Sequence, residues 1–192
     1  MKATTKLLII GAGGHGQSVA EAAELSGQFE VVGFVDDGLA IGTLVLGYPV
    51  LGSAVDLTAY VSVCDQVLVA IGNNTLRTSL AARLTQAGLS LATVVLPYAM
   101  VSQRAQIGAG SAVMACATVG TEAQLGLGSI VNCGAVVNHQ ARVENFGHLG
   151  VGACMAGGTV LGDKAWMQTG SSIGYDVVVD ACAALPPGAV FK

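Results

Sequence analysis

The sequence predicts two domains of different architecture: a small Rossmann-like α/β domain in residues 1–94 and an all-β, left-handed parallel β-helix in residues 95–192. Two observations support this prediction. Short aliphatic runs alternate with helical patterns in the first half, which favours strands joined by helices. From Val95 onward a strict six-residue period replaces that alternation, and this period is typical of hexapeptide solenoids. The left hand of the coil is the one known for such repeats.

The first half contains four predicted strands, each a short apolar run of the kind buried on both faces of a parallel sheet. Two helices are predicted between them, one from Gln17 to about Leu25 and one from Thr75 to Ala87, where Gly88 is a usual helix stop. Strand and helix in this order and spacing indicate a small doubly wound domain. The strands are expected at residues 7–10, 30–35, 66–71 and 91–96, with a short extended piece and turn at 48–52.

The second half keeps one register of hexads from Val95 to the end of the chain, without an insertion. Every hexad opens on an aliphatic residue or Met, and its fifth position is small in every case except Val177. The large lead side chain is expected to fill a triangular coil, and the small one to point inward where the taper leaves little room. Three hexads then close one coil, and successive coils stack at the strand spacing of about 4.8 Å.

Composition excludes several classes of protein. Hydrophobic residues make up 53% of the chain and charged residues only 10%, a balance shared by membrane proteins and stacked solenoids. A membrane helix needs about 18 consecutive apolar residues, and no such run exists. The apolar run near the start is too short for a signal peptide, so a cytoplasmic location is expected.

Net charge and cysteine spacing exclude further functions. A net charge of −4 argues against a nucleic-acid partner, which requires a basic face. The five cysteines are scattered and form no C-x-x-C pair, so we expect buried free thiols, with neither disulfides nor a metal site.

A glycine-rich loop, residues 11–16 (Gly-Ala-Gly-Gly-His-Gly), follows the first predicted strand. Such a turn before a helix lets backbone N–H groups approach a phosphate, and the helix N-terminus adds positive potential. Asp36 and Asp37, about 20 residues further on, suit contact with a ribose or a base. The loop therefore predicts a nucleotide site. An NAD-binding domain is the alternative, and the solenoid that follows argues against it.

Taken together, these motifs resemble the bacterial sugar acetyltransferases of the sialic-acid O-acetyltransferase and nucleotide-amino-sugar N-acetyltransferase type, within the hexapeptide-repeat superfamily. The resemblance covers nearly the full chain and rests on residues 9–16, 34–37, 70–74 with Arg77, 130–139 and 148–153. It implies acetyl transfer from acetyl-CoA, without a metal, to the amino group of a UDP- or GDP-linked 4-amino sugar for surface-glycan synthesis. It also implies a homotrimer with sites between subunits. O-acetylation of a sialic-acid-like sugar is one alternative, and a non-catalytic nucleotide-sugar-binding protein is another.

The resemblance also assigns site residues. His139 is the implied base, in the third position of its hexad, which should face outward. A neutral imidazole suits this role because its pKa lies near the working pH. It would take a proton from the attacking amine or hydroxyl, with Asn132 on the same coil as a further catalytic residue. An inert outward histidine is the alternative. The residues implied to hold the nucleotide sugar are Gly13, Gly14, His15, Asp36, Asp37, Gly72 and Asn73. For His15, a purely structural role in the loop is the alternative.

Acetyl-CoA is expected to contact His148, Gly157 and Thr169. Gly157 stacks one coil beyond His139 and would leave space for a slim acyl chain. His148 lies half a coil from His139, so it would serve a site shared with another subunit; an exposed corner histidine is the alternative.

Four departures from the family pattern are visible. Asn138 stands before the base, where an acidic residue is also common, and Val143-Glu144-Asn145 replaces the more usual Val/Ile-Gly-Asp turn. Gln140 stands where the family commonly has an acidic residue after the base, so it is expected to orient His139 without supplying a charge. The family normally continues to a Val-Pro-Ala-Lys motif that helps to hold CoA, whereas this sequence ends at residues 185–192, and weaker CoA binding is expected. Asn138, Gln140 and the short C-terminus favour the non-catalytic alternative slightly, whereas His139 and Asn132 oppose it.

Overall fold

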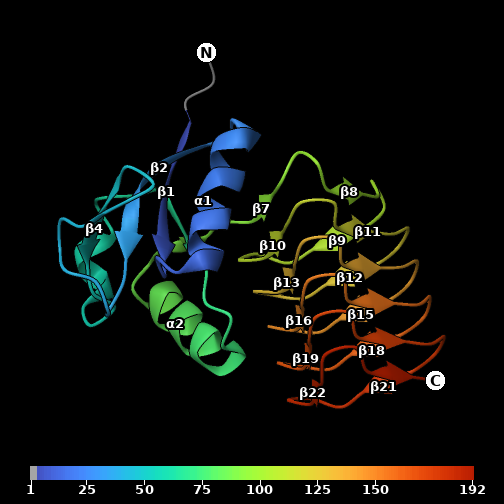
Figure 1. Ribbon diagram of the computed structural model, residues 1–192. Helices are drawn as coiled ribbons and strands as arrows, with labels where there is room; N and C mark the ends of the chain where they lie inside the picture. The colour runs from blue at the N-terminus through green and yellow to red at the C-terminus, as the bar shows by residue number, and fades with distance from the viewer. Residues whose placement is uncertain (1–3) are drawn as a thin grey trace. The chain divides into compact units, whose positions relative to one another are not determined.

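The computed structural model describes residues 4–192, and the chain divides into two compact units, residues 1–94 and 95–192. The predicted fold class is confirmed: a small α/β unit is followed by a solenoid of short parallel strands (Figure 1). No helix within residues 4–192 has the length and apolar character needed to cross a membrane.

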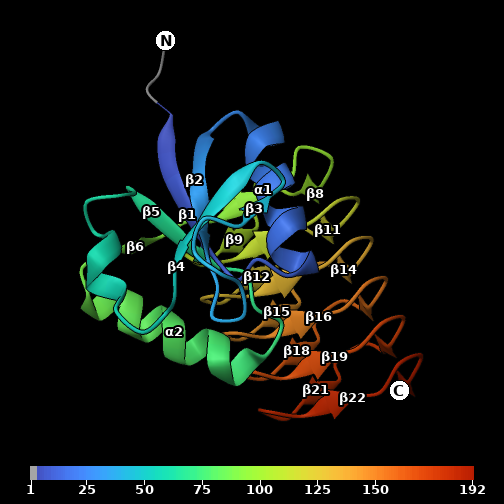
Figure 2. The same ribbon diagram turned by 60° about the vertical axis from the view of Figure 1, so that its left-hand side comes forward.

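The first unit is a mainly parallel sheet with strand order β3-β4-β2-β1-β5-β6. Helix α1 (Gly14–Ser26) packs on β1 and β2, and α2 (Asn74–Gln86) packs on β5, β6 and the 3-10 helix η1 (Leu57–Tyr60) (Figure 2). The strands are β1 (Thr5–Ile10), β2 (Phe29–Val35), β3 (Leu44–Val45), β4 (Tyr48–Gly52), β5 (Gln66–Val69) and β6 (Ser90–Leu91).

The strand order has a functional consequence. From β1 the chain proceeds to β2 and β4 on one side and later to β5 and β6 on the other. The order therefore reverses between β1 and β5, and ligands of such sheets bind outside the carboxyl ends of the strands at that point. Residues 7–10 of β1 are buried at the centre of the sheet, which fixes the position of the loop that follows.

One predicted strand was wrong. The apolar run at residues 91–96 was expected to form a single strand, but the structure divides it between the two units. β6 pairs Leu91 with Val67 of β5, whereas β7 (Val94–Val95) belongs to the first sheet of the solenoid. An apolar run cannot show such a division, because both halves are buried and both are extended.

The solenoid consists of three parallel sheets, one for each side of its coil. The first sheet contains β7, β10 (Ala112–Val113), β13 (Ile130–Val131), β16 (His148–Leu149), β19 (Trp166–Met167) and β22 (Ala184–Leu185). The second contains β8 (Met100–Val101), β11 (Thr118–Val119), β14 (Val136–Val137), β17 (Cys154–Met155), β20 (Ser172–Ile173) and β23 (Val190–Phe191). The third contains β9 (Gln106–Ile107), β12 (Gln124–Leu125), β15 (Arg142–Val143), β18 (Val160–Leu161) and β21 (Val178–Val179).

The hexad pattern has a direct structural cause. Strands pair with a constant offset of one coil, as Val137 pairs with Met155, so lead residues stack on lead residues in a buried core. From Gly110 to Gly188, the fourth residue of every hexad has a positive φ, which turns the chain at each corner. Glycine occupies half of these corners because it adopts this conformation without strain. The other half are Cys116, Glu122, Gln140, Phe146, Lys164, Asp176 and Cys182.

All five cysteines are free thiols, as expected, but the expected burial holds for Cys64 alone. Cys116, Cys154 and Cys182 are exposed, and Cys133 is half-buried. Cys116 and Cys182 are exposed because they occupy turning corners, where the side chain leaves the core.

Candidate functional site

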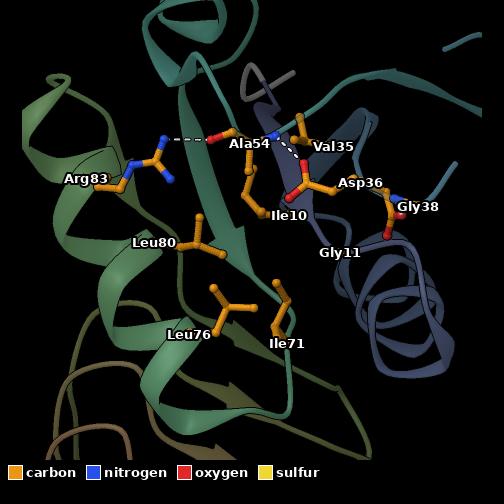
Figure 3. A pocket seen from close by; sticks show the side chains of 11 residues that line it. Ile10, Gly11, Val35, Asp36, Gly38, Ala54, Ile71, Leu76, Leu80 and Arg83 are labelled. Atoms are coloured by element: carbon orange, nitrogen blue, oxygen red, sulfur yellow. Dashed lines mark hydrogen bonds between the residues drawn. The ribbon is translucent and has the colours of Figure 1, made fainter. Parts of the chain in front are cut away.

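A cavity of about 280 Å³ lies in the first unit at the carboxyl ends of β1 and β2 and beside the loop after β5. This is the place where the strand order reverses. Its walls are apolar on one side and polar on the other, which suits a planar ring joined to a polar group. The apolar walls include Ile10, Val35, Ile71, Leu76 and Leu80, and the polar side includes Asp36 and Arg83 (Figure 3). Asp37 also lines the cavity.

Asp36 and Asp37 join three loops around this cavity. The carboxylate of Asp36 accepts hydrogen bonds from the N–H of Ala12, at 2.9 Å, and of Gly38, at 2.8 Å. The carboxylate of Asp37 accepts one from the N–H of Ala54, at 2.7 Å. Each carboxylate oxygen can accept more than one hydrogen bond, so both groups shape the cavity and can still meet a ligand.

Arg83 brings a positive charge to the same cavity. Its guanidinium donates to the carbonyl oxygen of Ala54, at 2.7 Å (Figure 3), and to that of Val55, at 3.0 Å. Sequence reasoning missed Arg83, together with Leu76 and Leu80 on the same helix. No local signal could have found them, since α2 meets the loop after β4 only through the tertiary fold.

The glycine-rich loop begins α1 as predicted, but α1 starts at Gly14 rather than Gln17. Gly13 is the N-cap, and the first-turn amides of a helix have no acceptor within the helix, so they can face an anion. A side chain at Gly16 would collide with the carbonyl of Gly11, which explains the third glycine as a packing requirement. Gly13 and Gly14 are exposed.

His15 and Arg77 lie close together beneath this loop. Burial, and then the charge of Arg77, lower the pKa of His15 to about 4, so its imidazole is neutral at pH 7. The Nε2 atom of His15 is buried without a hydrogen-bond partner among residues 4–192. The guanidinium of Arg77 is buried and donates to the carbonyl oxygens of Ile71, at 2.9 Å, and Gly72, at 3.3 Å.

Asn73 has a structural task in the first unit. Its side-chain oxygen accepts a hydrogen bond from the N–H of Leu76, at 2.9 Å, and so caps α2. Of the seven residues expected to hold the nucleotide sugar, Asp36 and Asp37 line the cavity. The other five lie at the starts of the two helices and are not among its lining residues: Gly13, Gly14, His15, Gly72 and Asn73.

His139 lies at the corner between β14 and β15, and its side chain is exposed. Its imidazole lies against Gly157, one coil further along. A Cβ atom at position 157 would lie 2.6 Å from Nε2 and 2.9 Å from Nδ1 of the ring. Only glycine at position 157 leaves space for the imidazole ring, and the ring of His139 packs against the backbone of Gly157.

Gln140 does not turn toward His139. Its amide nitrogen donates to the carboxylate of Glu122, at 3.3 Å, on the preceding coil. The imidazole of His139 extends instead toward the following coil, where Gly157 lies. The two side chains diverge along the solenoid axis, so within one chain Gln140 is not placed to orient His139.

The remaining predicted residues gather on another side of the coil. His148 is in β16 of the first sheet, only 7% exposed, and its ring stacks on Trp166 with centroids 5.6 Å apart and planes 18° apart. The alternative of an exposed corner histidine is therefore wrong. Asn132 and Thr169 both follow first-sheet strands, and the side chain of Asn132 accepts from the N–H of Cys133, at 2.8 Å. Within one chain, His139 meets Gly157 but none of these three.

No group of three or more His, Cys, Asp or Glu side chains within residues 4–192 is arranged to hold a metal ion.

Comparison with known proteins places this fold and these residues in a class. The family model described as the PglD N-terminal domain matches residues 6–84. A mutant of GDP-perosamine N-acetyltransferase from Caulobacter crescentus, crystallised with CoA and GDP-perosamine, shares 33% identity. The match covers 98% of this chain and 89% of that chain, with a TM-score of 0.92.

The acetyltransferase domain of PglB from Neisseria gonorrhoeae FA1090 is also similar, with 36% identity, 97% and 91% coverage and a TM-score of 0.92. The structure of that domain in complex with acetyl coenzyme A shares 33% identity with this chain. The match covers 98% of this chain and 93% of that chain, with a TM-score of 0.91. A comparison with curated protein sequences found no significant match.

The two units together define a hexapeptide-repeat acyltransferase with an N-terminal α/β domain. More specifically, the chain belongs to the family of PglD-type sugar acetyltransferases, and the resemblance inferred from its motifs is confirmed.

Proposed function

We propose that this protein transfers the acetyl group of acetyl-CoA to the amino group of a nucleotide-linked 4-amino sugar for surface-glycan synthesis. The observation that carries the proposal is the exposed imidazole of His139 against Gly157, in a chain 33% identical to an enzyme crystallised with CoA and GDP-perosamine. Acetyl-CoA and nucleotide sugars are cytoplasmic metabolites, so the proposal places the enzyme in the cytoplasm.

In the proposed reaction His139 is the general base. The amine of the sugar attacks the thioester carbonyl of acetyl-CoA, and His139 takes the proton that the nitrogen loses as the new bond forms. The C–S bond then breaks, and the departing sulfur takes the proton from the imidazolium of His139, so that CoA leaves as the free thiol. Histidine is the side chain most often used as a general base in such proton transfers.

The nucleotide portion of the sugar is proposed to bind in the first unit. Its base would enter the cavity lined by Leu76, Leu80 and Arg83, and its ribose would meet Asp36 and Asp37. Its phosphates would face the first-turn amides of α1, with His15 and the loop at Gly72 and Asn73 nearby. This assignment uses the cavity at the reversal of strand order, where ligands of such sheets bind.

A homotrimer completes the proposed active site. Within one chain, His139 and Gly157 lie on a different side of the coil from Asn132, His148 and Thr169. If acetyl-CoA binds between two subunits, Asn132, His148 and Thr169 of one subunit can contact the acetyl-CoA molecule. The thioester of that molecule then faces His139 of the neighbouring subunit. Exposed apolar side chains on the solenoid, such as Trp166 and Val178, are consistent with a surface that another subunit covers.

The chemical nature of the product tests the proposal. UDP- and GDP-linked 4-amino sugars are incubated with acetyl-CoA and the protein, and the products are treated with neutral hydroxylamine. An amide survives this treatment, whereas an O-acetyl ester is cleaved. We expect a hydroxylamine-stable product from at least one amino sugar. A product that hydroxylamine cleaves would instead support O-acetylation of a sugar hydroxyl, and protein that binds the sugar without forming product would support the non-catalytic alternative.

A further inference from the structure

Two consecutive glycines, Gly157 and Gly158, leave space at the corner between β17 and β18, and side chains from two neighbouring coils fill it. The imidazole of His139 enters from the preceding coil, with Nε2 and Nδ1 within 2.9 Å of the place of a Cβ at position 157. The carboxylate of Asp176 enters from the following coil, with Oδ1 2.6 Å from the place of a Cβ at position 158. Both groups therefore lie in the same layer of the solenoid.

Backbone hydrogen bonds hold these three coils in register at this corner. The N–H of Gly158 donates to the carbonyl of His139 at 3.1 Å, and the N–H of Asp176 donates to the carbonyl of Gly157 at 3.5 Å. Consecutive Cα atoms lie about 3.8 Å apart. The imidazole and the carboxylate therefore approach the same two-residue corner, one from the preceding coil and one from the following coil.

The other ionisable groups at this corner are less well placed. Glu122, on the preceding coil, is engaged by the amide of Gln140, on the side away from the imidazole of His139. Arg142, which follows on β15, pairs with Glu144 at 3.5 Å. Tyr175 is exposed two coils beyond His139 and has no carboxylate to offer. Asp176 is thus the carboxylate that lies on the same side as the imidazole.

We propose that Asp176 is a positioning residue for His139, supplying the negative charge that Gln140 lacks. When His139 takes the proton from the attacking amine, the carboxylate of Asp176 stabilises the imidazolium and keeps the ring over Gly157. The proposal rests on the proposed function, since it concerns the same base. It also explains how an acidic group can act on this base although the residue after it is an amide.

The test is the pKa of His139 in the full-length protein, measured by NMR titration of the imidazole C–H signals without substrates. The chain has three histidines, so the spectrum of His139→Ala assigns the signal. Asp176→Asn keeps the shape of the side chain and tolerates the positive φ of this corner. We expect this substitution to lower the pKa of His139 by a few tenths to about one unit, the range for a solvent-facing pair. The acidic limb of the pH profile of kcat/KM should move to lower pH by the same amount.

Two variants make the result decisive. Asp176→Gly, which suits a corner that is glycine in half of the hexads, should give the same shift and so exclude a folding artefact. Glu122→Gln, which removes the other nearby carboxylate, should give a clearly smaller shift. An unchanged pKa of His139 in both Asp176 variants, or an equal shift in Glu122→Gln, would overturn the proposal. The titration does not depend on turnover, so its result can be distinguished from a failure of the proposed function. That failure would appear as absence of acetyl transfer by the wild type.

Discussion

The imidazole of His139 and the backbone of Gly157 are in direct contact across one coil of the solenoid, so a side chain at position 157 would occupy the place of the ring. Gly157→Ala should therefore displace the ring. We expect turnover to fall by roughly 10-fold or more, because a misplaced base transfers protons poorly. The thermal midpoint should change little, since the displaced group is exposed.

Gly174→Ala is a matched control for this substitution. It also adds a methyl group at a corner of the solenoid, but its Cβ would make ordinary contacts of 3.4 and 3.5 Å with residues 191 and 192. Turnover should remain near that of the wild type. Equal losses in the two variants, measured as kcat with acetyl-CoA and an amino-sugar substrate, would show that the His139–Gly157 contact has no special role.

Gln140 is expected to have little influence on the base. Because its amide bonds Glu122 and its side chain diverges from His139, Gln140→Glu should leave the acidic limb of the pH–rate profile within a few tenths of a unit of its wild-type position. The substitution should instead lower stability by roughly 0.5–1 kcal/mol, since it replaces an amide–carboxylate hydrogen bond by two adjacent carboxylates. A shift of the limb to higher pH by a full unit would show that residue 140 reaches the imidazole after all.

Mixed oligomers test whether the active site is shared. His139→Ala removes the base, and His148→Phe removes the ring nitrogens while an aromatic ring remains to stack on Trp166. Each variant alone should be nearly inactive. Oligomers refolded from a mixture should recover part of the wild-type turnover, because some interfaces then combine an intact His139 with an intact His148. No recovery in oligomers shown by mass spectrometry to contain both variants would place the site within one chain.

His15 makes the stability of the protein depend on pH. Its pKa falls from 6.5 to about 4 on folding, so the folded state disfavours the protonated form. The stability that its neutral form contributes is present above pH 6.5 and is lost as the pH falls from 6.5 toward 4. Between pH 7 and pH 5 the free energy of unfolding of the wild type should fall by up to roughly 2 kcal/mol more than that of His15→Gln. Urea titrations at the two pH values measure this difference, and parallel losses in both proteins would refute the assignment.

Much of the fold could be predicted because each hexad of the sequence determines one side of the coil by itself. A large lead residue and a small fifth residue repeat with each side of the coil, and the structure places every lead residue on its counterpart one coil away. The outward position of His139 follows from the same register. The division of residues 91–96 between β6 and β7 could not be predicted, since it depends on which sheet each half joins.

The candidate site was less predictable, because its details depend on the direction in which side chains point along the solenoid axis. The register places Gln140 next to His139, but it does not reveal that one turns to Glu122 and the other to Gly157. Arg83 was missed because its partners, Ala54 and Val55, lie far from it in the sequence. Asp176 was missed because its carboxylate approaches the same corner as His139 only where Gly158, which has no side chain, leaves space for it.

The most direct test of the account is the release of CoA thiol from acetyl-CoA, followed with a thiol-reactive dye, for the wild type and His139→Ala. UDP- and GDP-linked 4-amino sugars are supplied one at a time, with each unlinked nucleotide as a blank. We expect thiol release that requires an amino sugar and that falls by roughly 10²- to 10⁴-fold in the folded His139→Ala variant, the usual range for loss of a general base. Sugar-dependent release at near wild-type rate in that variant, or no sugar-dependent release by the wild type with any amino sugar, would contradict it.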